Sequence, residues 1–239
     1  MIRLDKFLCE TVGVTRKQAA KVLKEERVTV DGEVIKNGAI KIAEDADVEF
    51  DGMSLSLSGP RYYMMNKPEG YVCSHDDPYN PTVFVLLDEI GAEKLHIAGR
   101  LDCDTTGLLL LTDDGQWSHR VTSPKHKCDK TYRVWLDDAV KEGVAATFAE
   151  GIKLRGEKTE TLPAQMEQID EKEVLLTIHE GKYHQVKRMF AAVGNKVVGL
   201  HRESIGELIL DEELEPGEYR ELTEEEIALF LPKQYTQTT

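Results

Sequence analysis

The feature that most constrains this chain of 239 residues is an unbroken apolar run near its middle, Leu108 to Leu111. Gly107 precedes the run, and Thr-Asp-Asp-Gly at 112–115 follows it with a turn signal. A short run without alternating polar residues is typical of a strand buried on both faces. The sequence therefore predicts a rigid interior strand that directly follows a polar loop, residues 99–104.

The polar loop contains Gly99-Arg100-Leu101-Asp102 and, two residues further on, Asp104. Loops next to a rigid strand are favourable places for catalytic side chains, because the strand holds them in position. Aspartates in such loops also commonly cap turns. The spacing alone therefore leaves both a catalytic and a purely structural role open for this loop.

Composition indicates a globular protein with enough apolar residues for a core, since 41% of the residues are hydrophobic and 31% are charged. The length favours one large domain or two unequal ones. No apolar run approaches the roughly 20 residues that cross a bilayer, and the N-terminus lacks a signal-peptide centre, so a cytoplasmic protein without a membrane partner is expected. The four cysteines lie far apart, which predicts reduced thiols and no zinc site.

Charge is distributed unevenly along the chain, whose net charge is −14. The segment from residue 201 to the end has three basic and eleven acidic residues, a net charge of −8. Segments 118–133 and 182–202 carry net charges of +4 and +5. A protein that is acidic overall can still bind RNA phosphates through such basic stretches. Solvated surface charge explains the same pattern, so charge alone does not decide between the two interpretations.

Residues 1–58 are predicted to form a small module of their own. The apolar residues between 4 and 8 share one helical face, and Thr15 with Gln18 has the spacing of a helix capping box. A hairpin with an Asp-Gly turn is predicted over 28–34. The basic side chains of the capped helix point away from its apolar stripe, namely those of Arg16, Lys17, Lys21 and Lys24.

Residues 59–239 are predicted to form a second, larger domain after a Ser-, Gly- and Pro-rich linker over 51–60. Strands outnumber helices in a mixed order, so the fold class is α+β with a largely antiparallel sheet. The predicted elements are strands at 62–65, 108–111 and 130–136, a helix capped by Asp138 and ending at Gly151, a hairpin over 164–179, a helix over 186–193 followed by Gly194, and a last helix opened by Thr223.

Motifs along nearly the whole chain resemble those of the pseudouridine synthases of the small-subunit-A type. Residues 99–115 resemble the catalytic motif of this family, and three further segments match in the family's order: 66–70, 130–132 and 181–189. The N-terminal module resembles the αL-type RNA-binding module of the ribosomal protein S-four family. The resemblance implies this module followed by a mixed, mostly antiparallel sheet domain with flanking helices.

The resemblance also implies roles for individual residues. Asp102 is expected to be the catalytic carboxylate, and the Tyr132 ring to stack on uracil while its hydroxyl helps to remove a proton from the ring carbon. Lys187, where many relatives have arginine, is expected to orient Asp102, with Arg188 as the other candidate. His184 and Gln185 serve either the substrate or the order of their loop. The expected RNA-binding residues are Arg100, Arg188, His184, Gln185, Arg3, Arg16, Lys17 and Lys21.

The function that the resemblance implies is isomerisation of a 16S ribosomal RNA uridine, uridine 516 by family expectation, to pseudouridine. The base must leave its stack to be reached, and a carboxylate assists cleavage of the glycosidic bond. We expect a monomer that needs no cofactor or metal and acts on 16S RNA or a small-subunit assembly particle. Three alternatives stay open: a synthase acting on another RNA, a non-catalytic ribosomal-RNA-binding assembly factor, and a hydrolase using Asp102 with Asp104.

Overall fold

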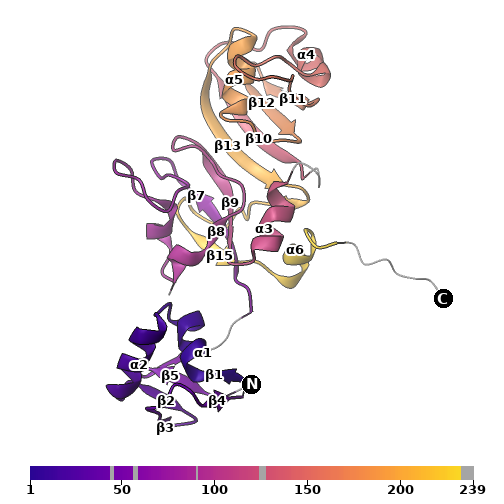
Figure 1. Ribbon diagram of the computed structural model, residues 1–239. Coiled ribbons are helices and arrows are strands. Elements are labelled where there is room, and N and C mark those ends of the chain that lie inside the picture. Colours follow the sequence, from indigo (N-terminus) through magenta and orange to yellow (C-terminus); the bar gives the residue numbers. More distant parts are fainter. Residues whose placement is uncertain (44–45, 56–58, 90, 124–127, 233–239) are drawn as a thin grey trace, which may run out of the picture. The chain divides into compact units, whose positions relative to one another are not determined.

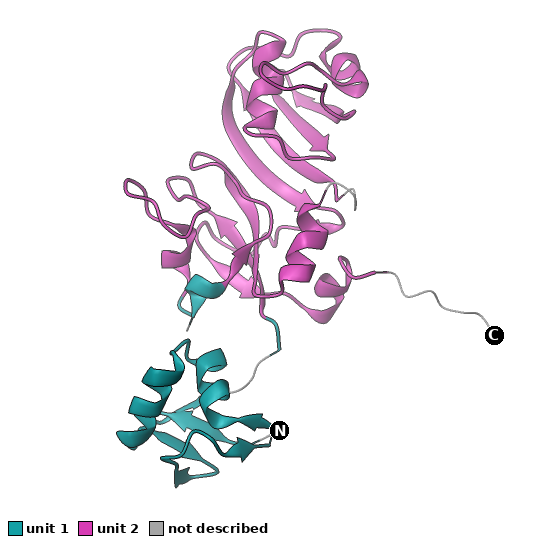
Figure 2. Ribbon diagram, viewed as in Figure 1, with its two compact units in different colours: residues 1–60, 88–94 teal, residues 61–87, 95–239 magenta. Residues whose placement is uncertain are grey.

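The computed structural model describes residues 1–43, 46–55, 59–89, 91–123 and 128–232, and divides the chain into two compact units (Figures 1 and 2). The first unit comprises residues 1–60 and 88–94, and the second comprises residues 61–87 and 95–239. Within the described ranges, no helix is both long enough and apolar enough to span a membrane.

The first unit packs two helices with short strands around a small apolar core (Figure 1). Thr15 accepts a hydrogen bond from the backbone N–H of Gln18, and the Gln18 side chain accepts from that of Thr15, which confirms the predicted capping box. The predicted hairpin over 28–34 is also present. The unit contains β1 (Ile2–Arg3), α1 (Leu4–Thr11), α2 (Arg16–Lys24), β2 (Val28–Val30), β3 (Glu33–Val34), β4 (Lys41–Ile42), β5 (Val48–Phe50) and β6 (Met53–Leu55), with the 3-10 helix η2 (Ala92–Lys94).

The predicted linker over residues 51–60 is wrong in its first half. Asp51 and Gly52 have φ angles of 52° and 79°, and they form the turn of a hairpin between β5 and β6. Gly and Asp tolerate this left-handed conformation, so a short Gly- and Ser-containing stretch fits a tight turn as well as a linker. Residues 56–58 lie outside the described ranges.

The second unit is organised by a nine-stranded sheet, in which β11, β12, β10, β13, β9, β7 and β15 follow one another, with β14 beside β13 and β8 beside β9 (Figure 1). Among the described strands of this sheet, every pairing is antiparallel except that of β9 with β13. The strands are β7 (Tyr62–Lys67), β8 (His96–Ile97), β9 (Thr106–Thr112), β10 (Lys130–Leu136), β11 (Gln165–Asp170), β12 (Glu173–Ile178), β13 (Val197–Ile205), β14 (Leu208–Ile209) and β15 (Tyr219–Glu221).

The helices of this unit cover the two halves of the sheet separately. Near β7, β8 and β9, the indole of Trp117 donates a hydrogen bond to the carbonyl of Ile227 and packs edge-on against Phe230. In the other half, Phe148 packs edge-on against Phe190. The helices are η1 (Val83–Leu86), α3 (Gly115–Thr122), α4 (Val144–Glu150), α5 (Gln185–Ala192) and α6 (Glu224–Ala228).

Several predicted elements are confirmed, and one is displaced. The apolar run 108–111 lies fully buried in β9, and the predicted strand over 130–136 is β10. The predicted cap of α4 is wrong: the helix begins at Val144 after Gly143 rather than at Asp138. The backbone N–H of Asp138 donates to the side-chain oxygen of Asn195, and the carbonyl of Asp138 accepts from the Asn195 amide, so this residue is tied to the end of α5.

The pairing of β9 with β13 is a short seam between the two halves of the sheet. It consists of two residue pairs, Thr106 with His201 and Gly107 with Arg202. A side chain at Gly107, whose φ is +100°, would clash with the backbone of Arg202. Because Arg202 is also the cross-strand partner of Tyr132 on β10, the seam brings the polar loop, β10 and β13 together.

Candidate active site

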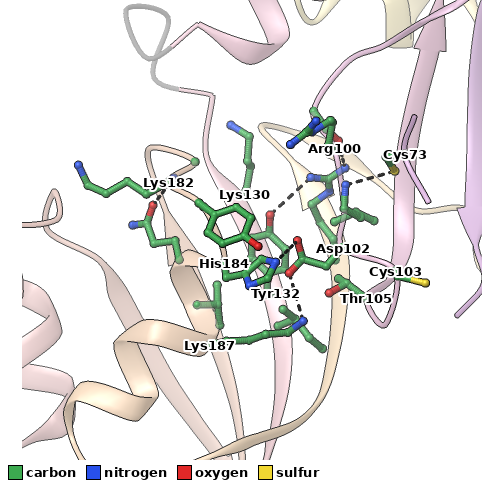
Figure 3. Close-up of a pocket in the computed structure, with 18 of the residues that line it drawn as sticks. Cys73, Arg100, Asp102, Cys103, Thr105, Lys130, Tyr132, Lys182, His184 and Lys187 are labelled. Carbon is green, nitrogen blue, oxygen red and sulfur yellow. Dashed lines mark hydrogen bonds and ion pairs between the residues drawn. The ribbon is translucent and has the colours of Figure 1, made fainter. Parts of the chain in front are cut away.

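A pocket of about 740 Å³ opens at this seam (Figure 3). Its walls come from separate parts of the chain, which include the polar loop with Asp102, β10 with Tyr132, β13 with Arg202, and the segment 181–187 that leads into α5. A pocket of this size is in the range that holds a small ligand or a single nucleotide. The structure thus brings the three predicted catalytic residues, Asp102, Tyr132 and Lys187, into one cavity.

The Asp102 carboxylate is held from two sides. Lys187 Nζ lies 3.1 Å from one oxygen, and His184 Nε2 lies 3.4 Å from the other, and dashed lines mark both in Figure 3. The side chain is still 29% exposed, so one part of the carboxylate faces the cavity. The geometry pairs Asp102 with Lys187 rather than with Arg188, and orients it without enclosing it.

Lys187 also contacts a second carboxylate. Its Nζ lies 2.5 Å from Asp104 Oδ1, so one ammonium bridges both aspartates. Burial opposes the charged form of Lys187, but the hydrogen bonds that it donates to Asp104 and Asp102 prevail and raise its pKa. Burial likewise opposes ionisation of Asp104, yet Lys187 holds the pKa of that carboxyl below its usual value. Both charges therefore persist through the neutral range.

Tyr132 lies on the pocket face of β10 and is 8% exposed. Arg202 Nη1 donates to its hydroxyl oxygen at 3.4 Å, and the guanidinium carbon lies 5.9 Å from the ring centroid. Because a guanidinium can only donate, the hydroxyl oxygen of Tyr132 accepts this bond. The hydroxyl proton is therefore free to point toward the cavity.

Arg202 is the site residue that the sequence motifs did not identify. It is fully buried, and its other nitrogens donate to the carbonyls of Leu108 on β9 and Gly99 in the polar loop, each at 2.8 Å. It makes no ion pair with any residue in the described ranges. The alternation of side chains along β13 could have identified it. Side chains two residues apart in a strand point to the same face, so Arg202 faces the interior together with the buried Leu200.

Lys67 supports the polar loop from the other side. Its buried ammonium donates to the carbonyls of Pro68, Cys103 and Thr105 at 3.0, 3.3 and 2.8 Å. Burial lowers the pKa of Lys67. The backbone N–H of Gly70 also donates to the carbonyl of Cys103, at 2.9 Å. The motif over 66–70 therefore holds the loop that carries Asp102.

The segment before α5 is fixed by two side chains that were predicted to bind substrate. Gln185 is buried, accepts a hydrogen bond from the backbone N–H of Lys182 and donates to Glu180, which fits its alternative role of ordering the loop. Arg188 is directed away from the pocket, toward Glu157 and the carbonyls of Tyr183 and Arg155. Of the predicted pair of cations, only Lys187 reaches Asp102.

Comparison with known proteins agrees with this geometry. Residues 61–192 match the model of RNA pseudouridylate synthases, and residues 2–48 match that of the S4 domain. The chain belongs to the RNA pseudouridylate synthase family. These matches, with the observed sheet, confirm the predicted fold class of an RNA-binding module followed by a pseudouridine synthase domain.

Individual relatives resemble this synthase over nearly its whole length. Ribosomal small subunit pseudouridine synthase A of Vibrio cholerae is 66% identical over 227 residues, which cover 95% of this chain and 98% of the relative. The protein of the same name from Escherichia coli K12 is 59% identical, with coverage of 95% and 99%. A crystal structure of a pseudouridylate synthase shares 56% sequence identity at a TM-score of 0.70, covering 97% of this chain and all of the other.

Further cations line the pocket of this pseudouridylate synthase. Arg100 is exposed at its wall, where a phosphate group can approach. Lys130 is buried, and its ammonium donates to the carbonyl of Cys128 at 2.8 Å. Burial and the neighbouring Arg202 lower the pKa of Lys130. The described residues contain no group of three or more His, Cys, Asp or Glu side chains arranged to hold a metal.

The predicted RNA-binding residues of the S4-type unit all lie on its surface. Arg16, Lys17 and Lys21 are exposed on α2. Lys21 lies 3.7 Å from Glu25, and Arg3 forms an ion pair with Asp5 at 2.6 Å. Surface pairs of this kind are weak, so these cations remain able to meet a phosphate.

Proposed function

We propose that this pseudouridine synthase isomerises one uridine of small-subunit ribosomal RNA, namely uridine 516 of 16S RNA. Support comes from relatives of up to 66% identity whose names contain the words ribosomal small subunit. The substrate is the 16S RNA itself or an assembling small-subunit particle. The enzyme works in the cytoplasm as a monomer, without a metal or cofactor.

One observation carries the catalytic part of the proposal: the Asp102 carboxylate, held by Lys187 at 3.1 Å, lines a pocket of about 740 Å³. The uridine flips out of its stack into this pocket. With assistance from Asp102 at the ribose C1′, the bond from N1 of uracil to C1′ breaks. The base turns and a bond from C5 to C1′ forms. The proton on C5 leaves and N1 gains one, so that substrate and product contain the same atoms.

The other pocket residues orient these steps. Lys187 and His184 hold the Asp102 carboxylate in position, so no reorganisation is needed when charge develops on the sugar. Tyr132 stacks on the flipped uracil and its hydroxyl takes part in removing the C5 proton. Arg202 fixes that hydroxyl, and Arg100 contacts a backbone phosphate of the flipped nucleotide.

We further propose that residues 1–58 dock the RNA, while residues 59–239 carry out the chemistry. The exposed cations of α2 support this division, since phosphate contacts fix the position of a nucleic acid without reading its sequence. In this division, Arg3, Arg16, Lys17 and Lys21 contribute affinity and leave the rate of the chemical step unchanged.

The test is a tritium-release assay on 16S RNA labelled at C5 of uridine, combined with mapping of pseudouridine. The wild-type protein should release tritium and place one pseudouridine at the predicted uridine. Asp102→Asn should fold, bind the RNA and form no detectable product. Release by Asp102→Asn at the wild-type rate would contradict the mechanism. Binding without release by the wild type would indicate a non-catalytic assembly factor, and liberation of free uracil would indicate a hydrolase.

A further inference from the structure

Tyr183 is an aromatic residue of the pocket wall that the mechanism above does not use. It is 71% exposed, whereas Tyr132, the other tyrosine of this wall, is 8% exposed. The two rings therefore occupy different zones, one inside the pocket and one at its mouth. Because the Tyr183 ring both lines the pocket and is open to water, a ligand that enters the pocket can cover it.

The backbone that carries Tyr183 is firmly held. Arg188 donates to the carbonyl of Tyr183 at 2.9 Å and is itself fixed by Glu157, at 2.9 Å, and by the carbonyl of Arg155, at 2.6 Å. The neighbouring backbone N–H of Lys182 donates to the Gln185 side chain at 2.8 Å. Two side chains from α5 thus fix the backbone that carries the exposed ring, which helps to preorganise a binding surface.

The Tyr183 ring is also oriented by its neighbour. It stacks on the His184 imidazole with ring centroids 3.8 Å apart and planes 20° from parallel. His184 has left-handed backbone angles, φ 47° and ψ 38°, and its Nε2 contacts Asp102. One face of the Tyr183 ring is therefore covered by His184, and the other face is available. Its hydroxyl forms no hydrogen bond within the described part of the chain, so the ring rather than the hydroxyl is the functional part.

We infer that Tyr183 is a stacking platform for the nucleobase next to the reacting uridine, a second base subsite at the mouth of the pocket. This inference rests on the function proposed above. When the uridine flips inward toward Tyr132, the adjacent base loses a stacking partner. The exposed face of Tyr183 replaces that partner, and every nucleobase has a flat face that suits it. The reacting uracil itself is excluded from this position, because it must reach the buried zone with Asp102 and Tyr132.

The test is a double-mutant cycle between the protein and the RNA, using the full chain and a 16S fragment that contains the target uridine. Tyr183→Ala and Tyr183→Leu should weaken the Kd for this fragment roughly 5- to 100-fold, the range of one lost base–aromatic stack. Tyr183→Phe should stay within about twofold of the wild type, because it keeps the ring. An abasic residue at one neighbour of the uridine should remove the difference between Tyr183→Ala and wild type.

The controls separate this inference from the proposed function. Tyr79→Ala removes a tyrosine that is 91% exposed but lies outside the pocket lining, and should change the Kd by less than about twofold. Pseudouridine formation by the wild type on the same fragment reports on the proposed function alone. If the wild type is active and Tyr183→Ala binds normally, the platform does not exist. An equal loss on intact RNA and on RNA abasic at either neighbour would show that Tyr183 contacts something other than a base.

Discussion

Two groups of cations in this protein occupy opposite environments. Those of α2 project into water, where they are free to meet a phosphate, and the group comprises Arg16, Lys17 and Lys21. A second group, beside the pocket, is buried, and its hydrogen bonds go to backbone carbonyls and, in one case, to the Tyr132 hydroxyl; this group comprises Lys67, Lys130 and Arg202. Exposed cations act on the ligand, whereas buried ones act on the protein.

The difference explains why the pocket keeps charges that are unfavourable to bury. A cation taken out of water loses several kcal/mol of hydration unless strong hydrogen bonds replace it. Arg202 and Lys67 recover this loss by binding carbonyls of the loop that carries Asp102, at Gly99, Cys103 and Thr105. The consequence is a loop held from both sides by donors that have no competing partner among the described carboxylates.

Among the cations of the two groups, replacing Arg202 should have the largest effect. Arg202→Met removes the bonds to Tyr132, Gly99 and Leu108 together, and displacement of reacting groups by about 1 Å costs roughly 10²-fold. We expect a fall in kcat of about 10²-fold or more with a smaller change in KM, measured by single-turnover tritium release. Arg202→Lys is the matched control, because it keeps the charge and loses the fork, and should give an intermediate rate. If Arg202→Met had the kcat of the wild type, the buried cations would not position the catalytic groups, and the proposed difference from the exposed cations would be wrong.

Replacing Lys67 should mainly reduce stability. Lys67→Met leaves the carbonyls of Cys103 and Thr105 with fewer donors, and should lower the free energy of unfolding by about 3 kcal/mol in a urea titration. Lys36→Met removes an exposed lysine that pairs with Glu26 at 2.6 Å, and should change the same quantity by less than about 0.5 kcal/mol. Equal losses in the two variants would show that burial of the charge has no special consequence.

The buried lysine also predicts a pH dependence. Because burial lowers the pKa of Lys67 in the folded protein, the unfolded chain binds more protons between that lowered value and the ordinary lysine pKa of about 10.4. The contribution of Lys67 to stability therefore rises with pH across this window. The free energy of unfolding, measured at several alkaline pH values within this window, should rise with pH in the wild type. The rise should be smaller in Lys67→Met. An identical pH profile in both proteins would contradict a lowered pKa of Lys67 in the folded protein.

Asp104 combines features of the exposed surface and of the pocket, since its side chain is 63% exposed and still bound to Lys187. Asp104→Asn removes one of two carboxylates from Lys187 and leaves the other, Asp102, in place. We expect a loss of kcat of less than about tenfold, because the reacting carboxylate keeps its cation. A loss of about 10²-fold would assign Asp104 a direct part in the chemistry, as an acid and base pair requires.

The exposed cations should give the smallest effect on the chemical step. A triple variant, Arg16→Gln, Lys17→Gln and Lys21→Gln, should leave kcat and the free energy of unfolding unchanged. It should weaken RNA binding and make the logarithm of the affinity less dependent on the logarithm of salt, by about 0.7 to 0.9 for each lost phosphate contact. An unchanged salt dependence would show that α2 does not face the RNA backbone.

The sequence predicted those parts of the fold and site whose signals are local. The buried run 108–111, the capping box at Thr15 and the strand over 130–136 each depend on a few neighbouring residues, and all three are present. The catalytic candidates Asp102 and Tyr132 were found by motif, and the structure brings them into one pocket. Local patterns therefore locate the elements, and the motifs identify which of them meet.

The features that were missed depend on distant contacts. Arg202 was counted only as part of a basic segment, because its partners, Gly99, Leu108 and Tyr132, are at least 70 residues away. Arg188 and Lys187 are adjacent and alike in charge, and only the direction of each side chain from α5 separates them. The hairpin turn at Asp51-Gly52 uses the same residues as a linker. In each case the sequence gives the residue type but not its partner.

The seam between β9 and β13 also bears on how the protein assembles. Its residue pairs join positions about 95 apart in the chain. Bringing such distant segments together costs conformational entropy before the contacts between them can form. The β10–β13 half comes from one continuous stretch, residues 130–205, so its strands pair with one another without the rest of the sheet. The pocket exists only once the two halves have joined. During synthesis, the ability to modify RNA therefore cannot arise before Arg202 has left the ribosome.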